Sequence, residues 1–157
     1  MAVLIKANAH GKPLPARKES RFRSRGASLG IRSCGTAKLI EQLEAGFPFD
    51  ALRKFELNSG VEANLLVSIL AIPERTLARR RTAGRFAPDE SERLLRISIV
   101  FERAVELFDG DVASAVQWLT TAKKALSGET PLKYSRTEPG AREVENLIGR
   151  VEHGVFS

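Results

Sequence analysis

Beyond residue 36 the apolar residues recur at intervals of three and four, which is the spacing of one face of an amphipathic helix. The strict alternation of a half-buried strand never persists for more than a few residues. Glycines, prolines and capping residues divide this pattern into segments of helical length. These segments predict helices over residues 37–45, 50–57, 61–70, 73–83, 88–108, 112–119 and 141–151, with a short helix beginning at Pro131. The sequence therefore predicts an all-α fold.

Two of these segments form a helix-turn-helix pattern. An apolar face that includes Leu65 is followed by the break Ala71-Ile72-Pro73, and Pro73 suits the first position of a second helix. Leu77 should point inward, which turns the polar side chains of this second helix outward. Five arginines within residues 75–85 are typical of a recognition helix, because arginine binds guanine O6 and N7 and also phosphate. The candidate DNA-binding residues are Arg75, Thr76, Arg79, Arg80, Arg81 and Arg85.

The longest helical period lies over residues 88–108, and acidic residues in its first turn favour the helix dipole. Its apolar face is formed by Leu94, Ile97, Phe101, Val105 and Phe108. This segment predicts the central packing helix. A helix-turn-helix protein usually binds paired half-sites as a dimer, and the apolar outer positions of this helix are the first candidates for the dimer surface.

The last part of the chain combines two capped helices with an apolar end. Thr130 caps a short helix whose first residue is Pro131, a position where the missing N–H costs nothing. One apolar face of the next helix consists of Val144, Leu147, Ile148 and Val151. Gly154 ends that helix, and the residues Val155-Phe156-Ser157 follow. A purely structural helix does not need an apolar, anionic end, so we expect this end to bind a partner.

The positive charge of the chain is concentrated at its N-terminal end. Of the net charge of +6, residues 1–36 contribute eight Lys/Arg and one Glu (+7), which leaves 17 basic and 18 acidic residues (−1) in 37–157. Residues 1–36 show no sustained apolar period, so we expect a disordered or loosely attached tail. Such a tail either follows DNA phosphates as an arm or is simply solvated.

The features of an enzyme are absent from the sequence. No nucleophile stands with a base, and there is no metal-ligand spacing or glycine-rich phosphate loop. His10 and His153 have no second ligand at a suitable spacing, and a lone cysteine, Cys34, fits a reducing compartment. No apolar run approaches the length of a membrane span. We therefore expect a cytoplasmic protein that is not an enzyme, with no cofactor, no metal and no membrane partner.

Three short motifs together resemble the Xre/MbcA/ParS antitoxin family. The C-terminal toxin-binding region of that family has an AL-x-G-x-x-PL block, then T-x-x-G-x-x-x-V, then a glycine near the end. The matching positions here are Ala125, Leu126, Gly128, Pro131, Leu132, Thr137, Gly140, Val144 and Gly154. The run Ile-Pro-x-x-Thr-Leu-x-Arg-Arg-Arg over residues 72–81 also resembles the recognition helix of this family.

With the charge distribution, the resemblance implies a basic tail over residues 1–36, an Xre-like helix-turn-helix body over 37–109, and a helical toxin-binding region over 110–157. It implies an antitoxin of a type II toxin–antitoxin pair that represses its own operon by binding operator DNA. The implied partner is a RES-domain toxin that consumes NAD, and the expected assembly is a homodimer within a larger toxin–antitoxin complex. The residues expected to cover the toxin active site are Leu147, Arg150, Val151, His153, Gly154, Val155, Phe156 and Ser157.

Two functions from other classes remain open at this point. The first is a stand-alone helix-turn-helix transcription regulator whose C-terminal part only dimerises, which a toxin gene beside this one would argue against. The second is an interaction adaptor whose arginines face solvent or another protein. A gel-shift assay that shows no specific retardation of the upstream DNA would favour the adaptor.

Overall fold

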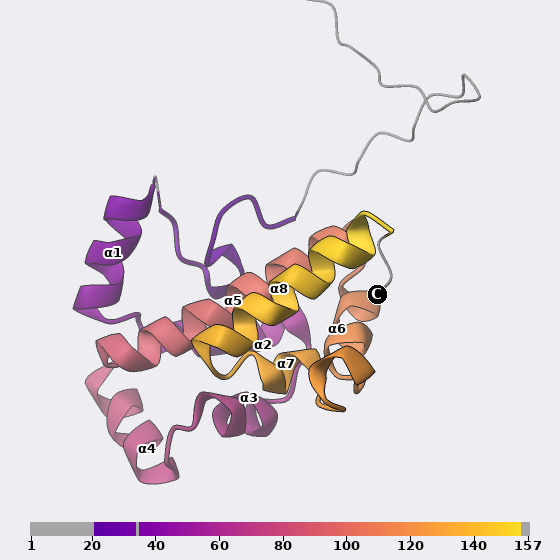
Figure 1. Cartoon of the computed structure of the whole chain (residues 1–157). Helices are drawn as coiled ribbons and strands as arrows, with labels where there is room; N and C mark the ends of the chain where they lie inside the picture. Colours follow the sequence, from indigo (N-terminus) through magenta and orange to yellow (C-terminus); the bar gives the residue numbers. More distant parts are fainter. Residues whose placement is uncertain (1–20, 34, 155–157) are drawn as a thin grey trace, which may run out of the picture.

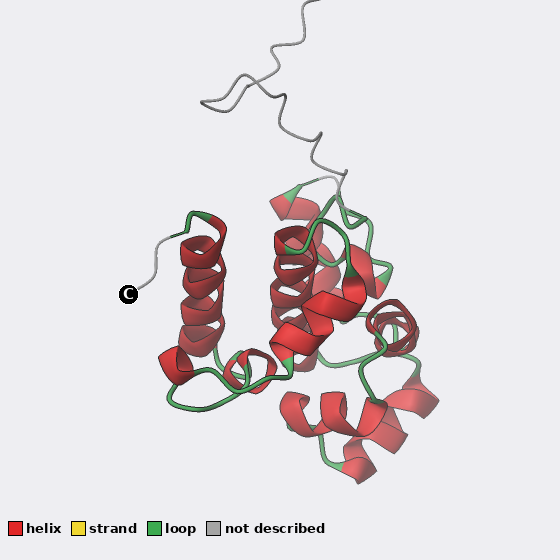
Figure 2. Cartoon of the chain, turned by 90° about the vertical axis from the view of Figure 1, so that its right-hand side faces the viewer, coloured by secondary structure: helices red, strands yellow, loops and turns green. Residues whose placement is uncertain are grey.

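The computed structural model describes residues 21–33 and 35–154 as an all-helical protein (Figure 1). The helices are α1 Thr36–Ala45, α2 Asp50–Ser59, α3 Ala63–Leu70, α4 Glu74–Ala83, α5 Pro88–Leu107, α6 Val112–Leu119, α7 Pro131–Tyr134 and α8 Glu138–Glu152, with 3-10 turns η1 Ala27–Leu29 and η2 Lys124–Leu126. The described part of the chain contains no strand (Figure 2), only one isolated antiparallel bridge between Pro48 and Arg85. The predicted all-α fold is confirmed.

Helix α5 runs through the middle of the molecule, and the other elements pack around it (Figure 1). Its buried apolar side chains are Leu94, Leu95, Ile97, Val100, Phe101, Ala104 and Val105. The prediction of a central packing helix is therefore confirmed.

The surroundings of α5 leave few apolar positions for the expected dimer surface. The exposed positions of this helix are Pro88, Asp89 and Glu92, all near its N-terminal end. Ile99 and Leu107 are half-buried against the core. No apolar side chain of α5 beyond Pro88 is fully exposed, so only half-buried side chains such as Ile99 and Leu107 could contribute to the expected dimer surface, which stays a prediction.

Most helix ends follow the capping residues expected from the sequence. Asp111 and Thr130 each accept a hydrogen bond from the backbone N–H three residues further on. Gly84 ends α4 in the left-handed conformation, with φ of 77°. Pro73 has extended backbone and precedes α4 as its cap, so this helix begins one residue later than expected, at Glu74.

The segment formed by residues 21–33 packs against the helical body. Leu29 and Ile31 are buried, with 1% and 7% of their surface exposed. The rings of Phe22 and Phe101 lie with their centroids 5.5 Å apart. The prediction of a disordered or loosely attached tail is therefore wrong for residues 21–33, whereas residues 1–20 lie outside the described part of the chain.

A buried carboxylate on α5 fixes this segment. Glu102 accepts hydrogen bonds from the backbone N–H of Gly26 (3.2 Å) and Ser28 (2.8 Å) and from the Ser28 hydroxyl (2.7 Å). Burial raises the pKa of Glu102 above its ordinary value, and the three hydrogen bonds oppose that rise. The segment has no continuous apolar stripe, and these hydrogen bonds to Glu102 help to hold it on the body.

The start of α8 packs closely on the short helix α7. Thr137 accepts a hydrogen bond from the N–H of Gly140 (3.2 Å), so α8 begins at Glu138, three residues before its expected start. A Cβ atom at Gly140 would overlap the carbonyl oxygen of Tyr134, whereas a Cβ at Gly149 in the same helix would meet open space. The absence of a side chain is therefore required at the first glycine and not at the second.

Replacing these two glycines by alanine should shift stability in opposite directions. Gly140→Ala should lower the free energy of unfolding by roughly 1–3 kcal/mol, because the new methyl group must displace backbone. Gly149→Ala should raise it by up to about 1 kcal/mol, because alanine loses less entropy than glycine in a helix. Chemical denaturation of both variants checks this, and equal shifts for the two would contradict the packing described for α7 and α8.

Candidate functional site

Helices α3 and α4 form the helix-turn-helix that the sequence predicts. Helix α3 buries Leu66, Ile69 and Leu70. Leu65 is 40% exposed, so the buried apolar face of α3 contains one residue fewer than the sequence pattern predicts. The turn depends on Ala71, which has a left-handed backbone with φ of 52°, and on buried Ile72. Helix α4 then lies at the lower edge of the molecule (Figure 1).

Helix α4 presents most of its side chains to solvent. None of its residues is buried, and Leu77 is half-buried against the core, as its inward direction predicts. The candidate DNA-binding residues divide into exposed Arg75, Arg79, Arg81 and Arg85 and half-buried Thr76 and Arg80. Glu74 is the one acidic residue of the helix and lies in its first turn. The arginine-rich surface predicted from the sequence is therefore present and accessible.

Arg80 differs from the other arginines because it binds a buried carboxylate. Its Nε donates to Oε2 of Glu90 at 2.8 Å, and 6% of the Glu90 side chain is exposed. The same oxygen accepts a hydrogen bond from the N–H of Ala87 at 2.7 Å, which closes the N-terminal turn of α5. Glu90 is thus a first-turn acid, as expected, and also the residue that fastens α4 to α5. No sequence pattern indicates this pair, because it joins two separate helices.

The C-terminal end of α4 is held by two further arginines. The guanidinium of Arg81 lies over the ring of Phe49, 5.5 Å from its centroid. Arg85 Nη1 donates to the carbonyl oxygen of Gly46 at 2.8 Å. Both contacts join the end of α4 to the link between α1 and α2. Arg81 and Arg85 therefore position the helix and still expose part of their charge.

Arg75 and Arg79 have the geometry best suited to a base contact. Within the described residues, neither side chain forms a hydrogen bond, an ion pair or a ring contact. They are four residues apart and therefore lie on the same face of α4. Both side chains are exposed, so no intramolecular bond has to break before they reach a ligand.

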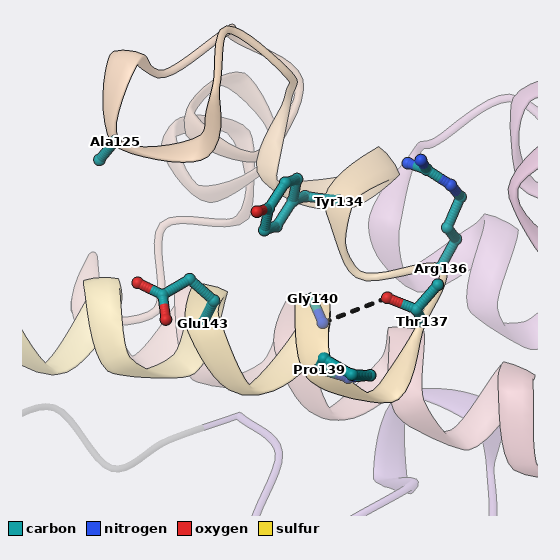
Figure 3. A pocket seen from close by; sticks show the side chains of 7 residues that line it. All are labelled: Ala125, Tyr134, Arg136, Thr137, Pro139, Gly140 and Glu143. Atoms are coloured by element: carbon teal, nitrogen blue, oxygen red, sulfur yellow. Dashed lines mark hydrogen bonds between the residues drawn. The ribbon is translucent and has the colours of Figure 1, made fainter.

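The C-terminal region contains a groove between α7 and the start of α8 (Figure 3). Its volume is about 510 Å³, and it is lined by Ala125, Tyr134, Arg136, Thr137, Pro139, Gly140 and Glu143. Arg136 Nη1 donates to Glu129 Oε2 at 2.8 Å, and this hydrogen bond holds the pKa of Glu129 below its ordinary value. The groove offers a phenol, a guanidinium and a carboxylate for binding, but no nucleophile paired with a base.

Most motif residues that carry the family resemblance are buried. Leu126, Leu132 and Val144 are at most 1% exposed, and Gly140 is buried beneath α7. These residues shape the contacts among η2, α7 and α8. These buried residues specify the fold of this region, whereas the motif residues Ala125, Gly128, Thr137 and Gly154 are exposed and remain accessible to a partner.

The residues predicted to bind a toxin lie in or after the last turns of α8. Leu147 and Val151 are half-buried, and Arg150 Nη2 lies 3.4 Å from Glu143 Oε1. His153 and Gly154 follow the helix and are exposed. The predicted residues 155–157 lie outside the described part of the chain. The toxin-binding assignments remain predictions.

Two other kinds of site are absent from residues 21–33 and 35–154. No group of three or more His, Cys, Asp and Glu side chains in these ranges could hold a metal ion. No helix in them is both long and apolar enough to span a membrane.

The arrangement defines an all-helical protein with a helix-turn-helix and a C-terminal helical unit on one shared core. Two family models match these parts: "Antitoxin Xre-like helix-turn-helix domain" over residues 38–98, and "Antitoxin Xre/MbcA/ParS C-terminal toxin-binding domain" over residues 103–154.

Similar proteins include the Antitoxin Xre of Yersinia enterocolitica, 39% identical over 146 residues that cover 92% of this chain and 97% of that protein. The Antitoxin Xre of Photorhabdus laumondii is 36% identical over 131 residues, 83% of this chain and 88% of that protein. The chain belongs to the Xre antitoxin family.

The Arg80–Glu90 pair should matter for stability more than its neighbour Arg79. Arg80→Met should lower the free energy of unfolding by about 1–3 kcal/mol, because the buried Glu90 carboxylate loses its charged partner. Arg79→Met, at an exposed position of the same helix, should change it by less than about 0.5 kcal/mol. Urea denaturation measures both, and equal losses would show that the pair does not fasten α4.

Proposed function

We propose that this chain is the antitoxin of a type II toxin–antitoxin pair and that it binds and neutralises a cognate RES-domain toxin that consumes NAD. The observation that carries the proposal is a helix-turn-helix and a toxin-binding domain of this family joined on one core. The RES-domain partner rests on the family resemblance. Co-purification with the product of the neighbouring gene tests it: a stable complex with a RES-domain protein supports the proposal, and failure to form one contradicts it.

We further propose that the end of the chain covers the active site of the toxin. A cleft that handles NAD needs cationic or N–H donors for the pyrophosphate and apolar walls for the rings. An apolar peptide ending in a carboxylate complements both features. Val155, Phe156 and Ser157 would supply this end, carried on the last turn of α8 with His153 and Gly154.

The DNA-binding role is proposed for α4. Arg75 and Arg79 would contact base edges in the major groove of the operator, because they are exposed and without an intramolecular partner in the described residues. Arg81 and Arg85 would bind phosphates. A homodimer within a larger toxin–antitoxin complex would place two copies of α4 on half-sites about 34 Å apart. Repression of its own operon would place the protein in the cytoplasm.

Substitutions on α4 and just after it should separate base contacts from phosphate contacts. Arg79→Ala should weaken operator binding by roughly 1–3 kcal/mol and relax the base preference, whereas Arg85→Ala should weaken binding similarly on all sequences. Titrations of both variants on operator and on random DNA measure the difference. Equal losses on both DNAs for both variants would refute this assignment.

Truncation should separate inhibition from DNA binding. Deleting residues 155–157 should release toxin activity in cells and leave operator binding and folding intact, because these residues lie beyond α8 and outside the helix-turn-helix. Growth of cells that carry the toxin, with the antitoxin at its native level, is the measurement. Full protection by the truncated protein would instead assign inhibition to the face of α8.

A further inference from the structure

The ordered N-terminal segment carries a cationic surface that the DNA-binding site does not use. Between residues 21 and 35 there is no acidic residue, and the segment exposes Arg21, Arg23 and Arg25. The hydrogen bonds from Gly26 and Ser28 to Glu102, together with the packing of Phe22 on Phe101, fix the position of these arginines on the body. Their charges therefore occupy a defined place on the folded protein.

A groove connects this segment to the C-terminal region. It has a volume of about 410 Å³ and is lined by residues 22–25, by four residues of α5 and by Glu145 of α8. Three of its residues, Arg103, Glu106 and Glu145, belong to the stretch 103–154 that matches the toxin-binding domain. The segment is therefore continuous with the toxin-binding domain, although it precedes that domain by about 80 residues in the sequence.

The segment lies far from the proposed DNA surface. In both views the described chain begins on the upper side of the molecule, the side that also holds the end of α8, and α4 lies at the lower edge (Figures 1 and 2). A phosphate-binding arm working with α4 in the same copy would need the opposite placement. The position of these arginines therefore favours a protein partner over DNA.

We propose that residues 21–25 and the adjoining groove form part of the toxin-contacting surface, where the exposed arginines bind an acidic patch of the toxin. This inference rests on the proposed function, because it takes the toxin as the partner. Charges at the edge of an interface act chiefly on the association rate and on its salt dependence. The segment would thus guide the toxin towards α8.

A charge-reversal pair tests the proposal on the full-length protein. Arg21→Glu with Arg25→Glu should weaken binding of the neighbouring gene's RES-domain product about tenfold, mainly through slower association. The change should be larger at low salt than at high salt. The matched control is Arg75→Glu with Arg79→Glu, which alters net charge equally and should abolish operator binding but leave toxin binding unchanged. Surface plasmon resonance with immobilised toxin and with operator DNA gives both affinities.

A second variant tests the anchor without changing any charge. Ser28→Ala removes the hydroxyl hydrogen bond to Glu102 and keeps all three arginines, so it should slow toxin association by a smaller factor. Thermal unfolding of each variant confirms that the body remains folded.

The outcomes distinguish this inference from the proposed function. If the wild-type protein does not bind the RES-domain product, both are wrong. If it binds and the Arg21→Glu, Arg25→Glu protein binds equally well, only the role of the segment is overturned. If that protein instead loses operator binding as the control does, the segment is a DNA arm, and the toxin surface does not include it.

Discussion

Helix α5 is the element on which the rest of the structure depends. It is one unbroken helix of 20 residues, and the match to the helix-turn-helix domain ends at residue 98 while the match to the toxin-binding domain begins at residue 103, both within it. Phe55 of α2 packs edge-on against Phe101 of α5, their ring centroids 5.2 Å apart, and α6 and α8 contact the same helix. Because both parts share this helix, α5 joins the helix-turn-helix to the C-terminal helices without a break.

Two buried carboxylates on α5 fasten the elements that have little apolar surface of their own. Glu90 binds Arg80 of α4, and Glu102 binds the backbone of residues 26–28. A helix that exposes this many arginines has no room for a wide apolar stripe, and the whole of α4 buries no residue. Hydrogen bonds to a charged group are stronger than neutral ones, and a single carboxylate can accept several of them. Polar anchoring therefore holds surfaces that need to remain accessible.

The sequence predicted the helices well because periodicity and capping are local signals. The bounds of α1, α2 and α6 and the caps Asp111 and Thr130 match the expectation closely. The sequence pattern overestimated the exposed apolar surface of α5, because such a pattern does not show how many neighbours cover a helix. The packing of residues 21–33 was missed because Leu29 and Ile31 follow no period and their anchor is more than 70 residues away.

The sequence predicted which residues make up the candidate site, but it did not predict the role of each residue. All six residues from Arg75 to Arg85 lie at the surface expected for them, although Thr76 and Arg80 are half-buried. Two of them bind partners in other elements: Arg80 binds Glu90 of α5, and Arg85 binds the Gly46 carbonyl in the link between α1 and α2. Only three-dimensional contacts separate the arginines that position α4 from those that are available to DNA.

The same division between folding and binding holds in the C-terminal region. The motif that carries the family resemblance places Leu126, Leu132 and Val144 in the core and Gly140 against the backbone of α7. Such residues build the same framework whichever toxin is bound, since they offer almost no surface to a partner. The framework leaves exposed positions between and around them, such as Arg142 and Asn146 on α8, accessible to a partner. The side chains at these positions contribute little to the core, because they are exposed.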